Sequence, residues 1–304
     1  MSEIIPTGYR MQLESSIFVA GHNGMVGSAI TRKLKEKGFK NLILKSSHEL
    51  DLMNQNQVQT FFYDNHIDYV FMAAAKVGGI FANQSNPAEF IYNNTLMQAN
   101  VIHQAYKSGV KKLLFLGSSC IYPKFATQPI EETSLLTGPL EPTNEAYAIA
   151  KINGLKMCEF YNQQYGFNAI SAMPTNLYGP NDNFNLETAH VLPALIHRFH
   201  LAKINNQETV TLWGTGSPYR EFMHVDDMAE AMIMLMNSYD EPTHINVGVG
   251  KDISIKDLAH LVKKIIGYKG EILFDATKPD GTPKKLLDIQ KLTNLGFKTK
   301  ISLE

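Results

Sequence analysis

Short apolar runs alternate with longer amphipathic stretches from residue 17 onward, and this alternation predicts repeated strand–helix units. Apolar runs of three to five residues, typical of strands buried on both faces, occur at 17–20, 42–44, 69–73 and 113–116. Helical periodicity follows these runs at 25–37, 55–65, 87–107 and about 145–165. Units of this kind build a parallel sheet with helices on both faces. We therefore predict an α/β fold with a doubly wound parallel sheet.

The pattern changes after residue 174, where glycines and prolines divide the chain into shorter elements. This change is typical of a smaller substrate-binding lobe inserted after the main sheet. The apolar stretches 225–236 and 244–247 are expected to return to that sheet. The predicted organisation is a flexible N-terminal extension (1–14), a nucleotide-binding domain (15–174, with a return near 225–250) and a mainly substrate-binding α/β lobe (175–304).

The composition narrows the functional classes. Lys and Arg number 28 against 29 Asp and Glu, and the net charge of −1 argues against nucleic acid or a membrane surface as the partner. No apolar run reaches the roughly 18 residues that span a bilayer, and residues 1–14 lack the pattern of a secretory signal. The two cysteines form no disulfide framework. We expect a cytoplasmic protein.

A glycine-rich turn, GHNGMVG at 21–27, directly follows the first predicted strand and opens the first helix. Glycines let the backbone approach a pyrophosphate, while the amides and dipole of a helix N-terminus favour its charge. In this position the turn predicts a dinucleotide-binding domain of Rossmann type.

The end of the second strand indicates which dinucleotide binds. An acidic residue there would bind the adenosine ribose hydroxyls and repel a 2′-phosphate. The chain instead has Lys45-Ser46-Ser47-His48, so NADP(H) is preferred over NAD. Asp51-Leu52 could contact the adenine edge, but Asp51 could equally cap the next helix, and both interpretations stay open.

Four residues suggest the chemistry. Tyr147 and Lys151 are four apart on a predicted helix and project from one face, and the ammonium is expected to lower the pKa of the tyrosine. Ser118 lies just past the strand at 113–116, where it could hold a substrate carbonyl while Tyr147 donates a proton. Cys120 adds a soft base two residues away. These residues predict carbonyl reduction together with a second kind of chemistry in the same pocket.

Several segments together carry a family resemblance: GHNGMVG (21–27), AAAKVGGI (73–80), GSSCIYPK (117–124), EPTNEAYAIAK (141–151), MPTNLYGPNDNF (173–184), WGTGSPYREFMHVDD (213–227), HINVG (244–248) and FDATKPDGTPKKLLD (274–288). They resemble the extended short-chain dehydrogenase/reductase family, and within it the epimerase-reductases that convert GDP-4-keto-6-deoxy-D-mannose to GDP-L-fucose. The resemblance covers nearly everything from about residue 16 onward. The chain departs from it at Asn23 and Ser47, where members often carry arginines that bind the 2′-phosphate. Members also usually continue for roughly another helix beyond 301–304.

The resemblance implies a role for each candidate residue. Ser118, Tyr147 and Lys151 would form the reductase triad. Cys120 with His190 would exchange the C3 and C5 protons, which the C4 ketone makes acidic. Cofactor contacts would come from Gly21, Asn23, Gly24, Met25, Val26, Gly27, Lys45, Asp51, Leu52, Ala74, Lys151, Pro174, Asn176, Leu177 and His190. The GDP-sugar would be bound by Asn176, Arg198, Trp213, Arg220, Asp280 and Lys285. No metal site is expected, because the segment 224–227 lacks a ligand spacing and is typical of a helix start.

Other functions stay open. A non-reducing NAD-dependent nucleotide-sugar epimerase would oxidise and re-reduce its cofactor in one turnover, but such relatives usually have Ser or Thr at position 120. A non-catalytic NADP-sensing module would usually have lost the Ser-Tyr-Lys set. A 4,6-dehydratase would want Asp-Glu where this chain has Ser119-Cys120. By analogy with the extended family, we expect a homodimer that pairs through the helices at 87–107 and 145–164.

Overall fold

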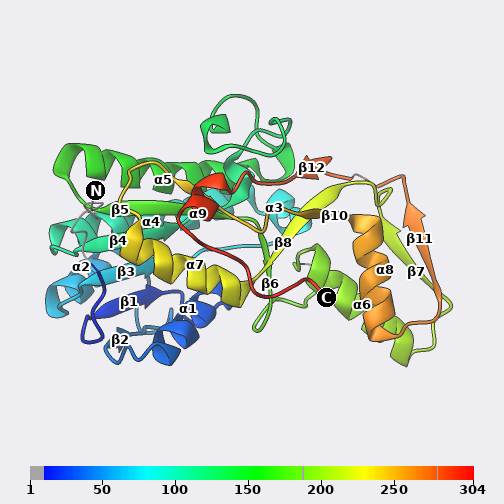
Figure 1. Cartoon of the computed structure of the whole chain (residues 1–304), viewed down its shortest axis with the longest axis horizontal. Helices are drawn as coiled ribbons and strands as arrows, with labels where there is room; N and C mark the ends of the chain where they lie inside the picture. The colour runs from blue at the N-terminus through cyan, green and yellow to red at the C-terminus, as the bar shows by residue number, and fades with distance from the viewer. Residues whose placement is uncertain (1–9, 187, 279) are drawn as a thin grey trace.

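A parallel sheet forms the centre of the computed structural model, which describes residues 10–186, 188–278 and 280–304 (Figure 1). Within the described residues the strands of this sheet run in the order β2-β1-β3-β4-β5-β9. They span Leu42–Ile43, Ile17–Ala20, Tyr69–Met72, Lys112–Leu116, Ala169–Pro174 and Ile245–Val247. The predicted doubly wound α/β fold is confirmed.

Helices cover both faces of the sheet (Figure 1). Helices α1 and α7 pack together on one face, and α2, α4 and α5 cover the other. Their bounds are Met25–Glu36, Val225–Ser238, Gln55–Asp64, Pro87–Lys107 and Glu145–Tyr165. Neighbouring strand residues point to opposite faces, so Ile17 and Val19 join one core cluster while Phe18 joins the other. Burial on both faces explains the continuously apolar strand runs.

After the first elements of the second lobe, α7 and β9 rejoin the central sheet. Strand β9 pairs with β5 at the edge of the sheet, and α7 packs beside α1. The fully buried Lys112 of β4 donates hydrogen bonds to the carbonyls of Leu235 and Tyr239 and pairs with Asp240 at 2.8 Å. These bonds satisfy carbonyls at the end of α7, where a cation also complements the helix dipole.

The second lobe combines two small sheets with two helices and a separate apolar cluster. Strands β6, β8, β10 and β12 form one sheet, and β7 pairs with β11. The strand bounds are Asn176–Tyr178, Tyr219–His224, Asp252–Ser254, Lys284–Lys285, Thr209–Trp213 and Glu271–Asp275. Its two helices are α6 (Val191–Ile204) and α8 (Ile255–Ile266). Outside this lobe, the short helix α3 (Ile80–Ser85) packs against α4, and the short helix α9 (Gln290–Asn294) packs against β9. The boundary between the nucleotide-binding domain and this lobe at residue 174 stays a prediction.

One segment joins the two parts of the chain. Residues 284–288 lie between β8 of the second lobe and the loop at 128–130. Ile130 donates its N–H to the Leu286 carbonyl (2.7 Å), and Asp288 donates to the Ile130 carbonyl (2.9 Å). The Gln128 side chain accepts the N–H of Leu286 (2.9 Å) and donates to the carbonyl of Lys284. We call residues 284–288 the joining segment.

Part of the predicted N-terminal extension, residues 1–9, lies outside the described residues. Met11 is buried and donates its N–H to the Asn237 side chain (2.9 Å). Among the described residues, no helix combines the length and the apolar character needed to cross a membrane.

Candidate active site

The carboxyl ends of the central strands bring the predicted site residues to one edge of the sheet. Gly21 follows β1, Ala74 lies two residues beyond β3, and Ser118 lies two residues beyond β4, while Pro174 ends β5. Open α/β sheets bind their ligands at this edge. The fold therefore gathers residues from four separate motifs in one place.

The glycine turn between β1 and α1 is a close-packed backbone cradle. Gly21 has a φ of +84°, which favours glycine, and a Cβ there would lie 2.7 Å from the Ala74 backbone. A Cβ on Gly27 would lie 2.1 Å from the Gly21 carbonyl oxygen. The buried Nδ1 of His22 has no hydrogen-bond partner in the described structure. A turn this tight, opening on the N-terminus of α1, fits the pyrophosphate of a dinucleotide.

Replacing Gly27 with alanine is expected to weaken NADPH binding by about 10- to 100-fold, because the new methyl group must displace the Gly21 carbonyl. Titration of NADPH fluorescence measures this affinity. Gly138→Ala is the matched control, since a Cβ there makes only ordinary contact with Pro123 at 3.4 Å. Equal affinities of the two variants would contradict the cradle assignment.

The segment after the second strand is held by its own side chains. The Glu49 carboxylate accepts bonds from the backbone and hydroxyl of Ser46 (2.9 and 2.7 Å) and pairs with Lys45 at 3.6 Å. Asp51 accepts the N–H of Met53, whereas Asn54 caps α2 by accepting the N–H of Gln57. The capping interpretation of Asp51 is therefore wrong, because a residue three positions further along occupies the cap. Its adenine contact stays a prediction.

Ser118 and Cys120 are joined by a single tight turn. Ser118 precedes the 3₁₀-helix Ser119–Ile121, and its hydroxyl oxygen accepts the N–H of Cys120 at 3.4 Å. Cys120 is 7% exposed. Burial raises the pKa of the Cys120 thiol, while the ammonium groups of Lys285 and Lys151 and the bond to Ser118 oppose this rise. The thiolate that a base requires thus depends on neighbouring cations.

Tyr147 and Lys151 lie in the first two turns of α5, facing the end of β4. The Lys151 ammonium donates to the Leu116 carbonyl (2.8 Å) and lies 5.8 Å from the centre of the Tyr147 ring. Burial raises the pKa of Tyr147, with a further rise from Cys120. The predicted lowering by the Lys151 ammonium is therefore not found, because burial and Cys120 both act to raise the pKa of Tyr147. A neutral phenol is the form that donates a proton.

Burial lowers the pKa of Lys151 to about 8, although the neighbouring Cys120 acts to raise it. We expect the rate of carbonyl reduction to fall about tenfold per pH unit above about pH 8, because the ammonium beside Tyr147 then loses its proton. Single-turnover NADPH oxidation across pH 6.5 to 9.5 measures this. Lys151→Arg keeps the charge at every pH and is expected to remove the decline. A wild-type profile that stays flat would contradict the assignment.

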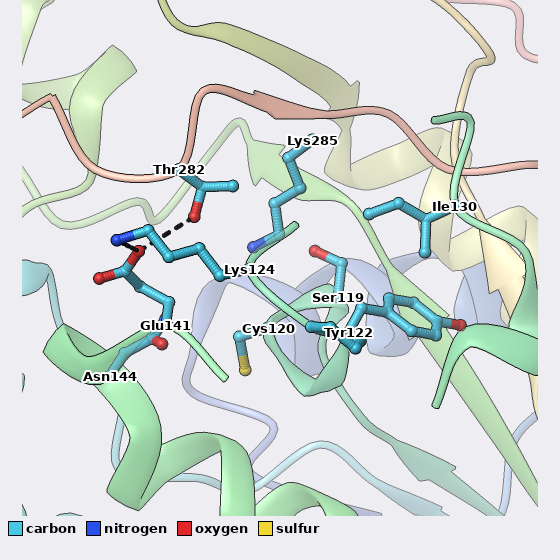
Figure 2. Close-up of a pocket in the computed structure, with 10 residues that line it drawn as sticks. Ser119, Cys120, Tyr122, Lys124, Ile130, Glu141, Asn144, Thr282 and Lys285 are labelled. Carbon is cyan, nitrogen blue, oxygen red and sulfur yellow. Dashed lines mark hydrogen bonds and ion pairs between the residues drawn. The ribbon is translucent and has the colours of Figure 1, made fainter. Parts of the chain in front are cut away.

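His190 and Lys285 reach the same place from the second lobe. His190 occupies the N-cap position of α6 without a side-chain capping bond, and Lys285 belongs to β12. Desolvation and the Lys285 ammonium lower the pKa of His190, and the same ammonium acts on Cys120. Figure 2 shows the Lys285 amine directed into the pocket that Cys120 lines. Lys285 is thus the charge common to both proposed epimerisation residues.

The pocket also contains polar residues that were not predicted from the sequence. Glu141 pairs with Lys124 at 3.0 Å and accepts the hydroxyl of Thr282 at 3.4 Å (Figure 2). Asn144 lines the same pocket, and its buried Oδ1 has no partner among the described residues. The sequence did contain a signal for these residues. Lys124 stands in the motif at 117–124, and Glu141 and Asn144 begin the motif at 141–151, so polar residues cluster just before the helix that carries Tyr147. The unpartnered Asn144 oxygen could accept a substrate hydroxyl.

Three further substrate candidates, Arg220, Asp280 and Trp213, are not among the residues that line this pocket, and each has other partners. Arg220 is half-buried. Burial lowers the pKa of its guanidinium, and the carboxylates of Glu141 and Asp280 oppose this lowering. Asp280 itself accepts the N–H and hydroxyl of Thr215 at 2.7 and 2.9 Å. Trp213 is 61% exposed, with the Lys278 ammonium 5.5 Å from its ring.

Two candidates are held by the second lobe itself. Arg198 donates to the carbonyl of Thr211 (3.3 Å), and Asn176 donates to the carbonyl of Glu221 (2.8 Å). Neither Arg198 nor Trp213 is among the residues that line the pocket around Cys120. Their contacts with a GDP-sugar stay predictions.

The chain belongs to the NAD dependent epimerase/dehydratase family, whose family model matches residues 17–248. Within that family it is similar to GDP-L-fucose synthases. GDP-L-fucose synthase 1 of Arabidopsis thaliana is 60% identical, covering 95% of this chain and 90% of that protein. The GDP-L-fucose synthase of Escherichia coli (strain K12) is 54% identical, covering 95% and 92%. The crystal structure of a GDP-L-fucose synthetase from Naegleria fowleri bound to NADP is 30% identical, with a TM-score of 0.87 over 96% of this chain and 92% of that one.

Proposed function

We propose that this protein is a bifunctional epimerase-reductase that converts GDP-4-keto-6-deoxy-D-mannose to GDP-L-fucose with NADPH. One observation carries the proposal: Cys120 lies one 3₁₀ turn beyond Ser118 at the end of β4, where Lys151 donates to the Leu116 carbonyl and lies 5.8 Å from the centre of the Tyr147 ring. A base and a carbonyl-reducing set in one pocket can act on one ketone. The identity of 54–60% to proteins named GDP-L-fucose synthase supports the same substrate.

Epimerisation uses the acidity that the C4 ketone gives to its neighbours. The Cys120 thiolate removes a proton from C3 or C5 and becomes a thiol, and protonated His190 gives a proton to the opposite face of the ring and becomes neutral. The Ser118 hydroxyl and the Tyr147 phenol donate hydrogen bonds to the ketone oxygen and stabilise the enolate. The ammonium of Lys285, which acts on both Cys120 and His190, favours the thiolate and keeps the imidazole neutral after each transfer.

Reduction then takes place at the same ketone. When bound, the reduced nicotinamide supplies a hydride to C4. Tyr147 gives its phenolic proton to the C4 oxygen, so that the ketone becomes an alcohol, and Lys151 stabilises the phenolate that is left. Arg220 and Lys285 hold the diphosphate of the GDP-sugar, since cations of this kind suit phosphate oxygens.

One assay separates this function from its alternatives. The enzyme is supplied with GDP-4-keto-6-deoxymannose and NADPH in deuterated water, and cofactor oxidation is followed together with the label at C3 and C5. The proposal expects net NADPH oxidation with deuterium at both carbons. Label without net oxidation would identify a non-reducing epimerase, oxidation without label a simple C4 reductase, and neither a binding module; each would overturn the proposal.

The proposal includes a homodimer in the cytoplasm. Helices α4 and α5 pack side by side, and both expose large apolar side chains, with Tyr92 63%, Ile149 43% and Phe160 58% accessible. A pairing through these two helices would cover that surface. Both cysteines are free thiols, which suits a reducing compartment. Light scattering against the 34.0 kDa chain mass tests the dimer.

A further inference from the structure

Lys285, which lines the pocket, is set beside a second cation, Arg220, by a very short strand pairing. Strand β12 consists of Lys284–Lys285 alone, and it runs parallel to β8 with Lys285 opposite Arg220. Residues paired in this way project from the same face of a sheet. Burial lowers the pKa of Lys285, and the positive charge of Arg220 lowers it further, because the two cations repel each other. A strand of two residues cannot hold such a pair by itself.

The residue after Arg220 adds a restraint from the β8 side. Glu221 has no exposed surface. One carboxylate oxygen accepts the N–H groups of Val249 (2.6 Å) and Gly250 (2.7 Å), and the other accepts the N–H of Leu287 (3.1 Å). Leu287 lies two residues beyond Lys285, so the carboxylate ties the joining segment to β8 directly behind the two cations.

The cost of burying this carboxylate indicates that the contact matters. Burial raises the pKa of Glu221, and the three amide bonds oppose that rise. Glu221 is absent from the residues that line the pocket, and it has no part in the proton transfers above. Its bonds serve the backbone of two loops, which is a way to place other groups.

We infer that Glu221 is a positioning residue: its buried carboxylate fixes the joining segment against β8, and thereby sets the Arg220–Lys285 pair at the spacing that a GDP diphosphate requires. This inference rests on the proposed function, since that function makes the two cations the diphosphate site. It assigns to Glu221 a role in substrate affinity that operates entirely through Arg220 and Lys285.

The substitution E221Q distinguishes a positioning role of Glu221 from a purely electrostatic one, because the two roles predict opposite changes in GDP affinity. Glutamine keeps the shape, but its NH₂ group faces an N–H donor where Glu221 had an acceptor. We expect the dissociation constant for GDP, measured by calorimetry, to rise about tenfold, since bonds to charged groups are strong. Loss of a negative charge alone would instead tighten the binding of an anion. The affinity for NADPH is expected to stay within about twofold.

Two further variants complete the test. Asp227 is 3% exposed and accepts the N–H groups of Lys300 and Ile301 (2.8 and 2.9 Å), so D227N disturbs a similar buried carboxylate that holds the C-terminal segment. It should leave GDP affinity unchanged. In G248A the new Cβ would lie 2.4 Å from Oε1 of Glu221 and displace the carboxylate with its charge intact. G248A should also weaken GDP binding, and it provides a second test if E221Q does not fold.

The outcomes separate the proposed function from the role of Glu221. A wild-type enzyme that does not bind GDP overturns the proposed substrate class and this inference with it. Wild-type binding with equal or tighter binding by E221Q overturns the inference alone. An equal loss of affinity in D227N and E221Q also overturns it, because any buried carboxylate would then serve.

Discussion

Replacing Cys120 with serine is expected to lower deuterium incorporation at C3 and C5 by at least about 10³-fold, because a serine hydroxyl does not ionise in the range where a thiol does. Cys120 lies where the cations of Lys285 and Lys151 favour its thiolate, and an alkoxide gains too little from the same cations. Proton exchange in deuterated water, followed by NMR of the GDP-sugar, measures the effect. The affinity for NADPH should not change.

Cys158→Ser is the matched control for this variant. Cys158 is a fully buried thiol on α5, and it belongs to the core cluster on the α4–α5 side of the sheet. Its replacement should lower stability and leave the exchange rate of the folded enzyme unchanged. Wild-type exchange by Cys120→Ser would remove Cys120 as the base, and an equal loss in both variants would reduce its role to packing.

Replacing Tyr147 with phenylalanine is expected to lower the rate of C4 reduction by about 10²- to 10⁴-fold, because the alkoxide that forms at C4 loses its proton donor. The ring itself should stay in place, since Phe90 contacts it edge to face with ring centres 6.3 Å apart. Single-turnover NADPH oxidation measures the loss. Exchange at C3 and C5 should persist in part, because Cys120 and Ser118 remain.

A second tyrosine on the same helix serves as the control. Tyr161 lies more than three turns further along α5, where its hydroxyl bonds to His103 at 2.8 Å. Tyr161→Phe removes an equivalent hydroxyl and should reduce the ketone at the wild-type rate. Unchanged turnover by Tyr147→Phe would remove Tyr147 as the acid, whatever Tyr161→Phe does.

The central sheet was predictable because its strands are buried on both faces and therefore read as continuous apolar runs. Each of the runs at 17–20, 69–73 and 113–116 overlaps a strand, and the predicted helix at 87–107 has the same bounds as α4. The cradle at 21–27 was predictable for a related reason, since a strand, three glycines and a helix follow one another without a gap.

The polar half of the pocket was not predictable from local pattern. Strand β12 has two residues and therefore no periodicity. The two residues that follow it soonest, Leu286 and Leu287, are bonded to the side chains of Gln128 and Glu221, which lie 158 and 66 residues away from them in the sequence. The capping interpretation of Asp51, one of the two left open, failed for a different reason, because Asn54 offers an equally good cap closer to α2. The direction of the Tyr147 pKa shift depends on burial, which four-residue spacing does not reveal.

The joining segment has a consequence for how substrate enters. Residues 284–288 are hydrogen-bonded to the loop at 128–130 on one side and to β8 on the other. A hinge opening of the two lobes at this point would therefore have to break these bonds. A protein held in its binding-competent state spends none of its affinity on reaching that state. On the proposed function, the Arg220–Lys285 pair is therefore already assembled before the GDP-sugar binds.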